Sequence, residues 1–170
     1  ERLIQHNVGI IVLGEGSLAY EERLLRLMED YPLRLAANVS YTEDLAHRIQ
    51  AGVDIFLMPS RYEPCGLTQM YALRYGAVPV VARTGGLADT VIDASPAGLR
   101  AGVATGGQFH PTTTAALARA IDHLCDLYAQ TAIWAQMQKN AMRHPVGWDQ
   151  SALEYRALYD ALAGAPTGRA

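Results

Sequence analysis

Four short apolar runs recur along the first half of the chain. They are rich in Val, Ile and Leu and show no alternation of polar and apolar residues, a pattern typical of strands buried on both faces of a parallel sheet. The runs are Val8–Gly14 (VGIIVLG), Leu33–Val39 (LRLAANV), Asp54–Pro59 (DIFLMP) and Val78–Ala82 (VPVVA). A fifth, short strand is expected further on, in the segment QFHP.

The segments between these runs carry apolar residues at three- and four-residue intervals, which predicts helices. Pro, Gly and Thr stand where helices end or begin, and Gly-rich sequence after the fourth run predicts an irregular stretch. The expected helices are 19–32, Thr42–Gly52, Gly66–Gly76, a short helix after TGGL, almost all of the chain from Thr112, and a last amphipathic helix over Trp148–Leu162.

Strands that alternate with helices predict a doubly wound α/β sheet, and such folds bind ligands at the carboxyl ends of their strands. Two turns fall at that edge, PSRYEPCG and ARTGG. We expect Gly66 to begin a helix, so that the amides of Leu67 and Thr68, with the Thr68 hydroxyl, face a phosphate. In the second turn, Thr84–Gly86 offers bare backbone to a ligand. The alternative is that EPCG is only a connector between a strand and a helix.

Composition narrows the classes of function. The net charge of −3 argues against a general nucleic-acid binder, and half of the residues are hydrophobic, as in a globular protein. Cys65 and Cys125 are the only cysteines, and no metal-ligand spacing is present, so we expect reduced thiols, a cytoplasmic location and no metal. Lys139 is the only lysine, so chemistry that needs a lysine has one candidate.

The two turns and their surroundings resemble one family. PSRYEPCGLTQMYALRYG followed by VPVVARTGGLADTV is similar to bacterial glycogen synthases and plant starch synthases, and the resemblance extends over YTEDLAHRIQAGVDIFLMPSR, GVATGGQFHP and W-D-x-S-A-x-E-Y-x-x-L-Y. It implies transfer of glucose from ADP-glucose to the non-reducing end of an α-1,4-glucan with retention, without a cofactor. It also implies a GT-B enzyme with two Rossmann-like domains, of which this chain resembles the C-terminal, donor-binding one.

The resemblance also implies roles for residues at matching positions. Glu63 is expected to be the catalytic acidic residue that contacts the donor glucose, with Pro64, Cys65 and Gly66 lining the sugar pocket. Leu67 and Thr68 are expected to hold the phosphates. Tyr41 is expected to stack on adenine, and Arg83, Thr84, Gly85 and Gly86 form the loop at the site.

The resemblance further predicts the organisation of the chain. We expect a nucleotide-sugar-binding domain over residues 1–163 and a disordered tail over 164–170. The central first strand, an Arg/Lys phosphate clamp and an N-terminal acceptor domain are expected to be missing, which would leave the strands near Val8–Leu13 and Asp54–Met58 with open edges and the fragment inactive on its own.

Three alternatives remain at this point. One is a UDP-sugar retaining transferase of the same architecture, and another is a nucleotide-sugar-binding module without catalysis. The third, a dinucleotide-dependent oxidoreductase, is disfavoured, because LGEGS (residues 13–17) supplies only part of the G-x-G-x-x-G pattern after the first strand.

Overall fold

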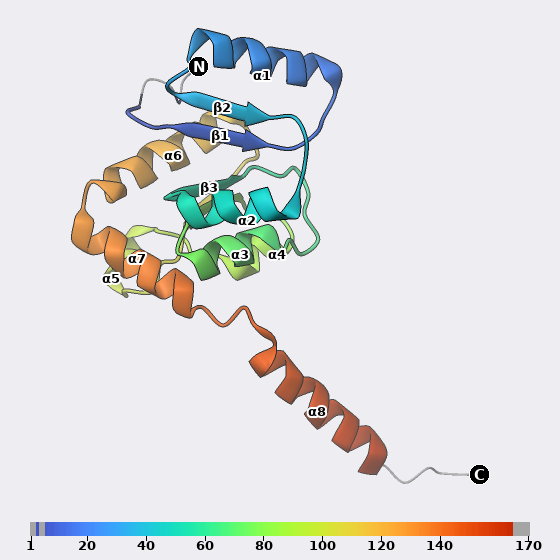
Figure 1. Cartoon of the computed structure of the whole chain (residues 1–170). Coiled ribbons are helices and arrows are strands. Elements are labelled where there is room, and N and C mark those ends of the chain that lie inside the picture. Colours follow the sequence, from blue (N-terminus) through green and yellow to red (C-terminus); the bar gives the residue numbers. More distant parts are fainter. Residues whose placement is uncertain (1–2, 4–5, 165–170) are drawn as a thin grey trace.

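A computed structural model of the chain describes residue 3 and residues 6–164 (Figure 1). Strands and helices alternate in the predicted order, which confirms the α/β class. The first half contains β1 (Ile10–Leu13), α1 (Leu18–Asp30), β2 (Leu35–Asn38), α2 (Glu43–Gly52) and β3 (Ile55–Met58). The second half contains α3 (Thr68–Tyr75), β4 (Val78–Ala82), α4 (Gly86–Thr90), α5 (Pro96–Arg100), β5 (Gly107–Phe109), α6 (Thr114–Tyr128), α7 (Thr131–Arg143) and α8 (Trp148–Gly164).

The short helix α5 lies in the stretch for which the sequence predicted irregular structure. Ser95 caps this helix, because its hydroxyl accepts a hydrogen bond from the Gly98 amide at 3.3 Å. Pro96 occupies the first helical position, where its missing N–H costs nothing. The S-P-x-G sequence was therefore a start signal for a helix, masked by the surrounding glycines.

The strands of the described residues pair in parallel but form two separate sheets instead of one. β1 pairs with β2, with Ile10 opposite Leu35, and β4 lies between β3 and β5. No described strand pairs with the remaining edge of β1 or of β3, and Figure 1 shows β1 as the strand of the first sheet that faces β3. The open edges predicted for the first and third apolar runs are therefore present.

Burial of the strands follows from this division. β4 has a strand on each side and is completely buried along its five residues. β3 is only half-buried, and in β1 the side chain of Ile11 is 51% exposed. The expectation that the first and third runs are buried on both faces is therefore wrong for this chain, because the neighbour that would cover them is absent from the described residues.

The largest core lies between β4 and the helices α6 and α7. Val78 and Val80 of β4 pack with Leu124 and Met137, all fully buried or nearly so. The ring of Trp134 is also buried there and meets Tyr128 edge to face, with 5.1 Å between the ring centroids. This core supports the β3–β4–β5 sheet, whose strands β3 and β4 lead into the two turns.

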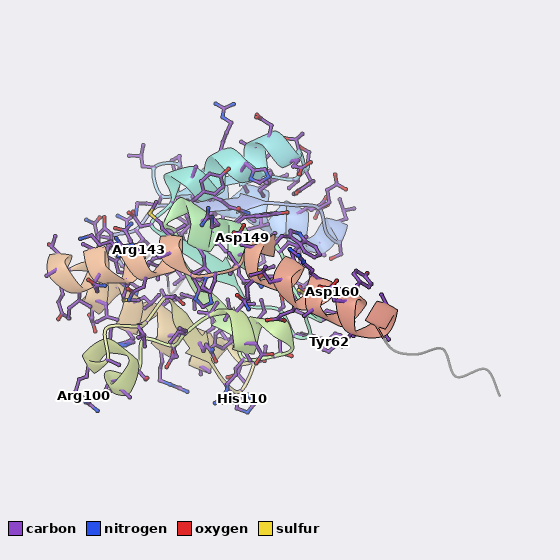
Figure 2. All side chains as sticks on the ribbon, turned by 90° about the horizontal axis from the view of Figure 1, so that it is seen from below. Tyr62, Arg100, His110, Arg143, Asp149 and Asp160 are labelled. Atoms are coloured by element: carbon purple, nitrogen blue, oxygen red, sulfur yellow. The ribbon has the colours of Figure 1, made fainter. Side chains whose placement is uncertain are left out.

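The last helix, α8, extends away from the rest of the fold, and in Figure 2 the half that carries Asp160 lies beyond the other elements. It buries none of its residues. Trp148 and Tyr155 of this helix are 75% and 51% exposed and contact each other, with ring centroids 6.3 Å apart. Gly164 belongs to the helix, and residues 165–170 of the expected tail lie outside the described residues.

Among the described residues, no helix combines the length and the apolar character needed to cross a membrane.

Candidate functional site

The loops that follow β1, β2 and β3 lie on the same side of the two sheets (Figure 1). This edge is where a parallel α/β fold binds its ligands. The first turn, between β3 and α3, and the second turn, between β4 and α4, are both at this edge and in contact with each other. The structure therefore brings together the two turns that the sequence singled out.

The first turn contains a glycine that no other residue replaces easily. Gly66 has φ of +73°, in the left-handed region. For this reason Gly66 cannot begin the helix, and α3 starts two residues later than the sequence predicted, at Thr68. The first helical hydrogen bond runs from the Tyr71 amide to the Leu67 carbonyl at 3.0 Å.

The start of α3 leaves backbone donors available. The amides of residues 67–70 precede the first helical hydrogen bond and have no acceptor among the described residues. Such amides, with the positive end of the helix dipole, favour an anion. The Thr68 hydroxyl does not join them, because it lies 3.3 Å from the Met58 sulfur and points into the fold. The hydroxyl is therefore turned away from the amides beside which it was predicted to donate, and the donors available at this end of α3 are the backbone amides.

The second turn packs directly on the backbone of the first turn. The Gly86 amide donates a hydrogen bond to the Pro64 carbonyl at 3.1 Å. A Cβ added to Gly86 would lie 2.8 Å from the Cys65 Cα and from the Cys65 carbonyl oxygen. Gly85 has φ of +46°, and a Cβ there would overlap the Glu63 carbonyl oxygen. Both glycines therefore serve the contact between the turns, and not only the approach of a ligand as the sequence predicted.

Three charged side chains at this edge have no partner in the part of the chain that the structure describes. The half-buried carboxylate of Glu63 forms no hydrogen bond or ion pair there, and neither do the exposed guanidinium groups of Arg61 and Arg83. The backbone of Glu63 is fixed by the packing of Gly85 against its carbonyl. A fixed backbone with a free carboxylate can present hydrogen-bond acceptors to the hydroxyls of a ligand.

Tyr41 lies on the loop between β2 and α2, at the same edge but beside the other sheet. Its side chain is 59% exposed and forms no hydrogen bond or ring contact with a described residue. Next to it, Thr42 caps α2 by accepting from the Leu45 amide at 3.4 Å. The ring of Tyr41 is therefore free to stack, but the structure does not bring it into contact with Glu63 or Thr68.

A group of aromatic side chains between α2 and α3 was not identified as a unit from the sequence. The Tyr75 hydroxyl lies 3.3 Å from Nδ1 of His47, and the Tyr71 ring centroid lies 5.2 Å from that of His47. His47 therefore makes a structural contact between the two helices. This group fixes α2 against α3 and so holds the loop of Tyr41 relative to the first turn.

The buried Gln69 was also missed by the sequence analysis, although it follows the first turn directly. Its side chain is fully buried, and its amide nitrogen contacts the first turn at Cys65 and the helix α4 at Thr90. The available signal was a polar residue near the start of a helix and on its inward face. It stands three residues after a glycine and four residues after a cysteine.

A model of the family described as glycosyl transferases group 1 matches residues 1–142. The chain belongs to this family. Two similar relatives are the glycogen synthase of Cereibacter sphaeroides, 56% identical over 154 residues, and glycogen synthase 2 of Agrobacterium fabrum, 47% identical over 165 residues. These alignments cover 91% and 97% of this chain, but 32% of each relative. The chain thus spans about a third of the length of these relatives.

Solved structures agree with this assignment. The catalytic domain of starch synthase IV from Arabidopsis thaliana, bound to ADP and acarbose, superposes with a TM-score of 0.83 at 27% identity, over 94% of this chain and 33% of that one. A sucrose-phosphate synthase from Thermosynechococcus elongatus gives a TM-score of 0.64 at 25% identity, over 89% of this chain and 38% of that one. The predicted resemblance to glycogen and starch synthases is therefore confirmed.

Proposed function

We propose that this chain is the donor-nucleotide domain of a retaining glucosyltransferase, which transfers glucose from ADP-glucose to the non-reducing end of an α-1,4-glucan. The observation that carries the proposal is the pair of interlocked turns at the sheet edge: the first turn holds both the Glu63 carboxylate and the amides at the start of α3, and neither has a partner among the described residues. The names of the relatives and the ADP bound to the starch synthase structure support the choice of donor.

In this proposal different groups at the two turns bind the diphosphate and the glucose of the donor. The amides at the start of α3 hold the diphosphate and stabilise the negative charge that develops on it as the bond to glucose breaks. Glu63, with Cys65 and Gly66 beside it, meets the hydroxyls of the glucose. The loop of Arg83–Gly86 supports that pocket from behind, and the Arg83 side chain is free to contact the ligand.

Adenine is proposed to stack on Tyr41. Stacking of a base on an aromatic ring contributes roughly 1–3 kcal/mol and favours the larger purine over uracil. The two sites then lie at one edge but on different sheets, so the nucleotide would span from the β2–α2 loop to the start of α3.

The acceptor glucan and the remaining phosphate contacts are proposed to belong to the rest of a longer enzyme. The chain spans about a third of its relatives, and its single lysine, Lys139, lies on α7, away from both turns. A further segment of the longer enzyme would also supply the strand that pairs with the open edges of β1 and β3.

Calorimetric titration of this chain with ADP and with UDP tests the proposal. ADP is expected to bind more tightly, and Tyr41→Ala is expected to abolish the difference. Tighter binding of UDP would favour a UDP-sugar transferase of the same architecture. Failure of both nucleotides to bind would contradict the assignment as a donor domain.

A further inference from the structure

Gln69 occupies the contact between the two turns. It is the second residue of α3 and has no exposed surface. Its side-chain nitrogen Nε2 lies 3.0 Å from the Cys65 carbonyl oxygen, 2.9 Å from the Gly66 carbonyl oxygen and 3.1 Å from the Thr90 hydroxyl. One buried amide group therefore donates to the first turn and to α4 together.

Thr90 extends this connection to the second turn. Its hydroxyl accepts from Gln69 and donates to the Gly86 carbonyl at 2.8 Å. A continuous chain of hydrogen bonds thus runs from Cys65 and Gly66 through Gln69 and Thr90 to Gly86. Together with the Gly86–Pro64 hydrogen bond, it links the turns at two places.

The direction of these hydrogen bonds determines where the neighbouring amides point. In a trans peptide unit the C=O and the N–H point in opposite directions. Because the Cys65 and Gly66 carbonyls turn inward to Gln69, the amides of Gly66 and Leu67, which belong to the same peptide units, turn outward. Neither amide has an acceptor among the described residues.

The fit around Gln69 is close. A Cβ on Gly66 would overlap Oε1 of Gln69, and this oxygen has no hydrogen-bond partner among the described residues although it is buried. A buried acceptor without a partner carries a free-energy cost. The Gln69 side chain keeps this position although Oε1 accepts no hydrogen bond from a described residue. This is consistent with a role that depends on the other polar atom, Nε2.

We propose that Gln69 is a positioning residue of the donor site: it fixes the peptide planes of Cys65–Leu67 so that the Gly66 and Leu67 amides face the phosphates of the nucleotide. The inference rests on the proposed function. Thr90 supports Gln69 in this role by holding Nε2 and the second turn. Neither side chain contacts the ligand.

The test uses Gln69→Leu, which keeps the size of the side chain and removes the donor. Gln50→Leu is the matched control, because Gln50 is also a buried glutamine with an unpartnered Oε1, but on α2. ADP binding is measured by calorimetry, binding of adenosine by NMR titration, and stability by thermal unfolding. Adenosine carries the base without the phosphates, so a role in phosphate binding changes the affinity for ADP alone.

Gln69→Leu is expected to weaken ADP binding about 10- to 100-fold, the range for hydrogen bonds to a charged group, and to leave adenosine binding unchanged. Gln50→Leu is expected to leave both unchanged. Thr90→Val is expected to weaken ADP binding in the same direction, and Thr90→Ser, which keeps the hydroxyl, to restore it. These two variants decide the question if Gln69→Leu does not fold.

Three outcomes would overturn the inference. If Gln69→Leu binds ADP as the unchanged chain does, the donor site stands and Gln69 has no positioning role. If it loses ADP and adenosine equally, or no more than Gln50→Leu does, its effect is on the fold as a whole. If the unchanged chain binds no ADP, both the proposed function and this inference fail.

Discussion

Replacing Gly86 by alanine tests whether the glycines of the second turn serve the fold or only the ligand. A Cβ at this position would lie 2.8 Å from two Cys65 atoms and 3.1 Å from the Pro64 carbonyl oxygen. All three are backbone atoms, which cannot turn aside as a flexible side chain does. The two turns must therefore separate, and the hydrogen bond from Gly86 to Pro64 lengthens.

The size of the effect follows from these contacts. Overpacking of a close contact costs about 1–3 kcal/mol, and a weakened hydrogen bond adds about 1 kcal/mol. We expect Gly86→Ala to lower the free energy of unfolding by about 2–4 kcal/mol, which for a chain of this size lowers Tm by about 4–16 °C. The assay is thermal unfolding followed by circular dichroism, without any nucleotide present.

Gly52→Ala is the matched control for this substitution. Gly52 ends α2 with nothing within 4 Å of an added Cβ, so alanine is expected to leave Tm unchanged or to raise it slightly through helix propensity. If Gly86→Ala unfolds at the same temperature as the unchanged chain, the turns are not interlocked, and the glycines are there for the ligand alone.

Three further predictions concern single side chains. In the proposed full-length transferase, we expect Glu63→Gln to lower kcat by about 10²–10³-fold while the Kd for ADP changes little. Glucose incorporation measures the first quantity and calorimetry the second. An equal loss in both would assign Glu63 to the structure of the turn. Burial, with the carboxylates of Asp122 and Asp126, raises the pKa of the Cys125 thiol. We therefore expect the exposed Cys65 to react first with a thiol reagent at neutral pH. Equal labelling of the peptides that contain Cys65 and Cys125, measured by mass spectrometry, would refute this. Burial lowers the pKa of His144 from its usual 6.5, so the contribution of this residue to stability is present above that pH and is lost as the pH falls through the lower folded value. We expect His144→Gln to flatten this decline when unfolding midpoints are measured against pH. Parallel profiles for the variant and the unchanged chain would be evidence against this.

The order of the elements could be predicted from the sequence because it depends on local signals. Apolar runs marked all of the first four strands, and capping residues such as Thr42 and Gly76 marked helix ends. The start of α3 was misplaced because Gly66 adopts a left-handed conformation, and glycine is compatible with that conformation and with a helix start alike. In the structure Gly66 packs against the buried side chain of Gln69, a contact that residue type alone does not report.

The two turns lie at the sheet edge, as the sequence predicted, but the contacts between them could not be predicted. The carboxyl ends of parallel strands meet at one edge whatever their sequence, so the motifs at Glu63–Thr68 and Arg83–Gly86 were expected there. That Gln69 and Thr90 join these turns depends on side-chain directions on two helices. No spacing in the sequence reports such a contact.

The exposure of β1 and β3 was predicted from topology and not from residue type. Their apolar composition alone predicts complete burial, as in β4. The half-exposed side chain of Ile11 shows that a neighbour is lacking among the described residues. We expect a parallel strand to occupy this position in the longer enzyme, which would join the two sheets into one.

Whether the start of α3 holds the phosphates of an ADP-containing donor can be measured by mapping the binding of ADP on the backbone amides of the ¹⁵N-labelled chain. We expect the largest chemical-shift changes on the amides of Gly66, Leu67 and Thr68, with a second group around Tyr41. Shifts centred elsewhere, for example on the apolar hollow that Leu99, Ile133 and Met137 line between α5 and α7, would contradict it.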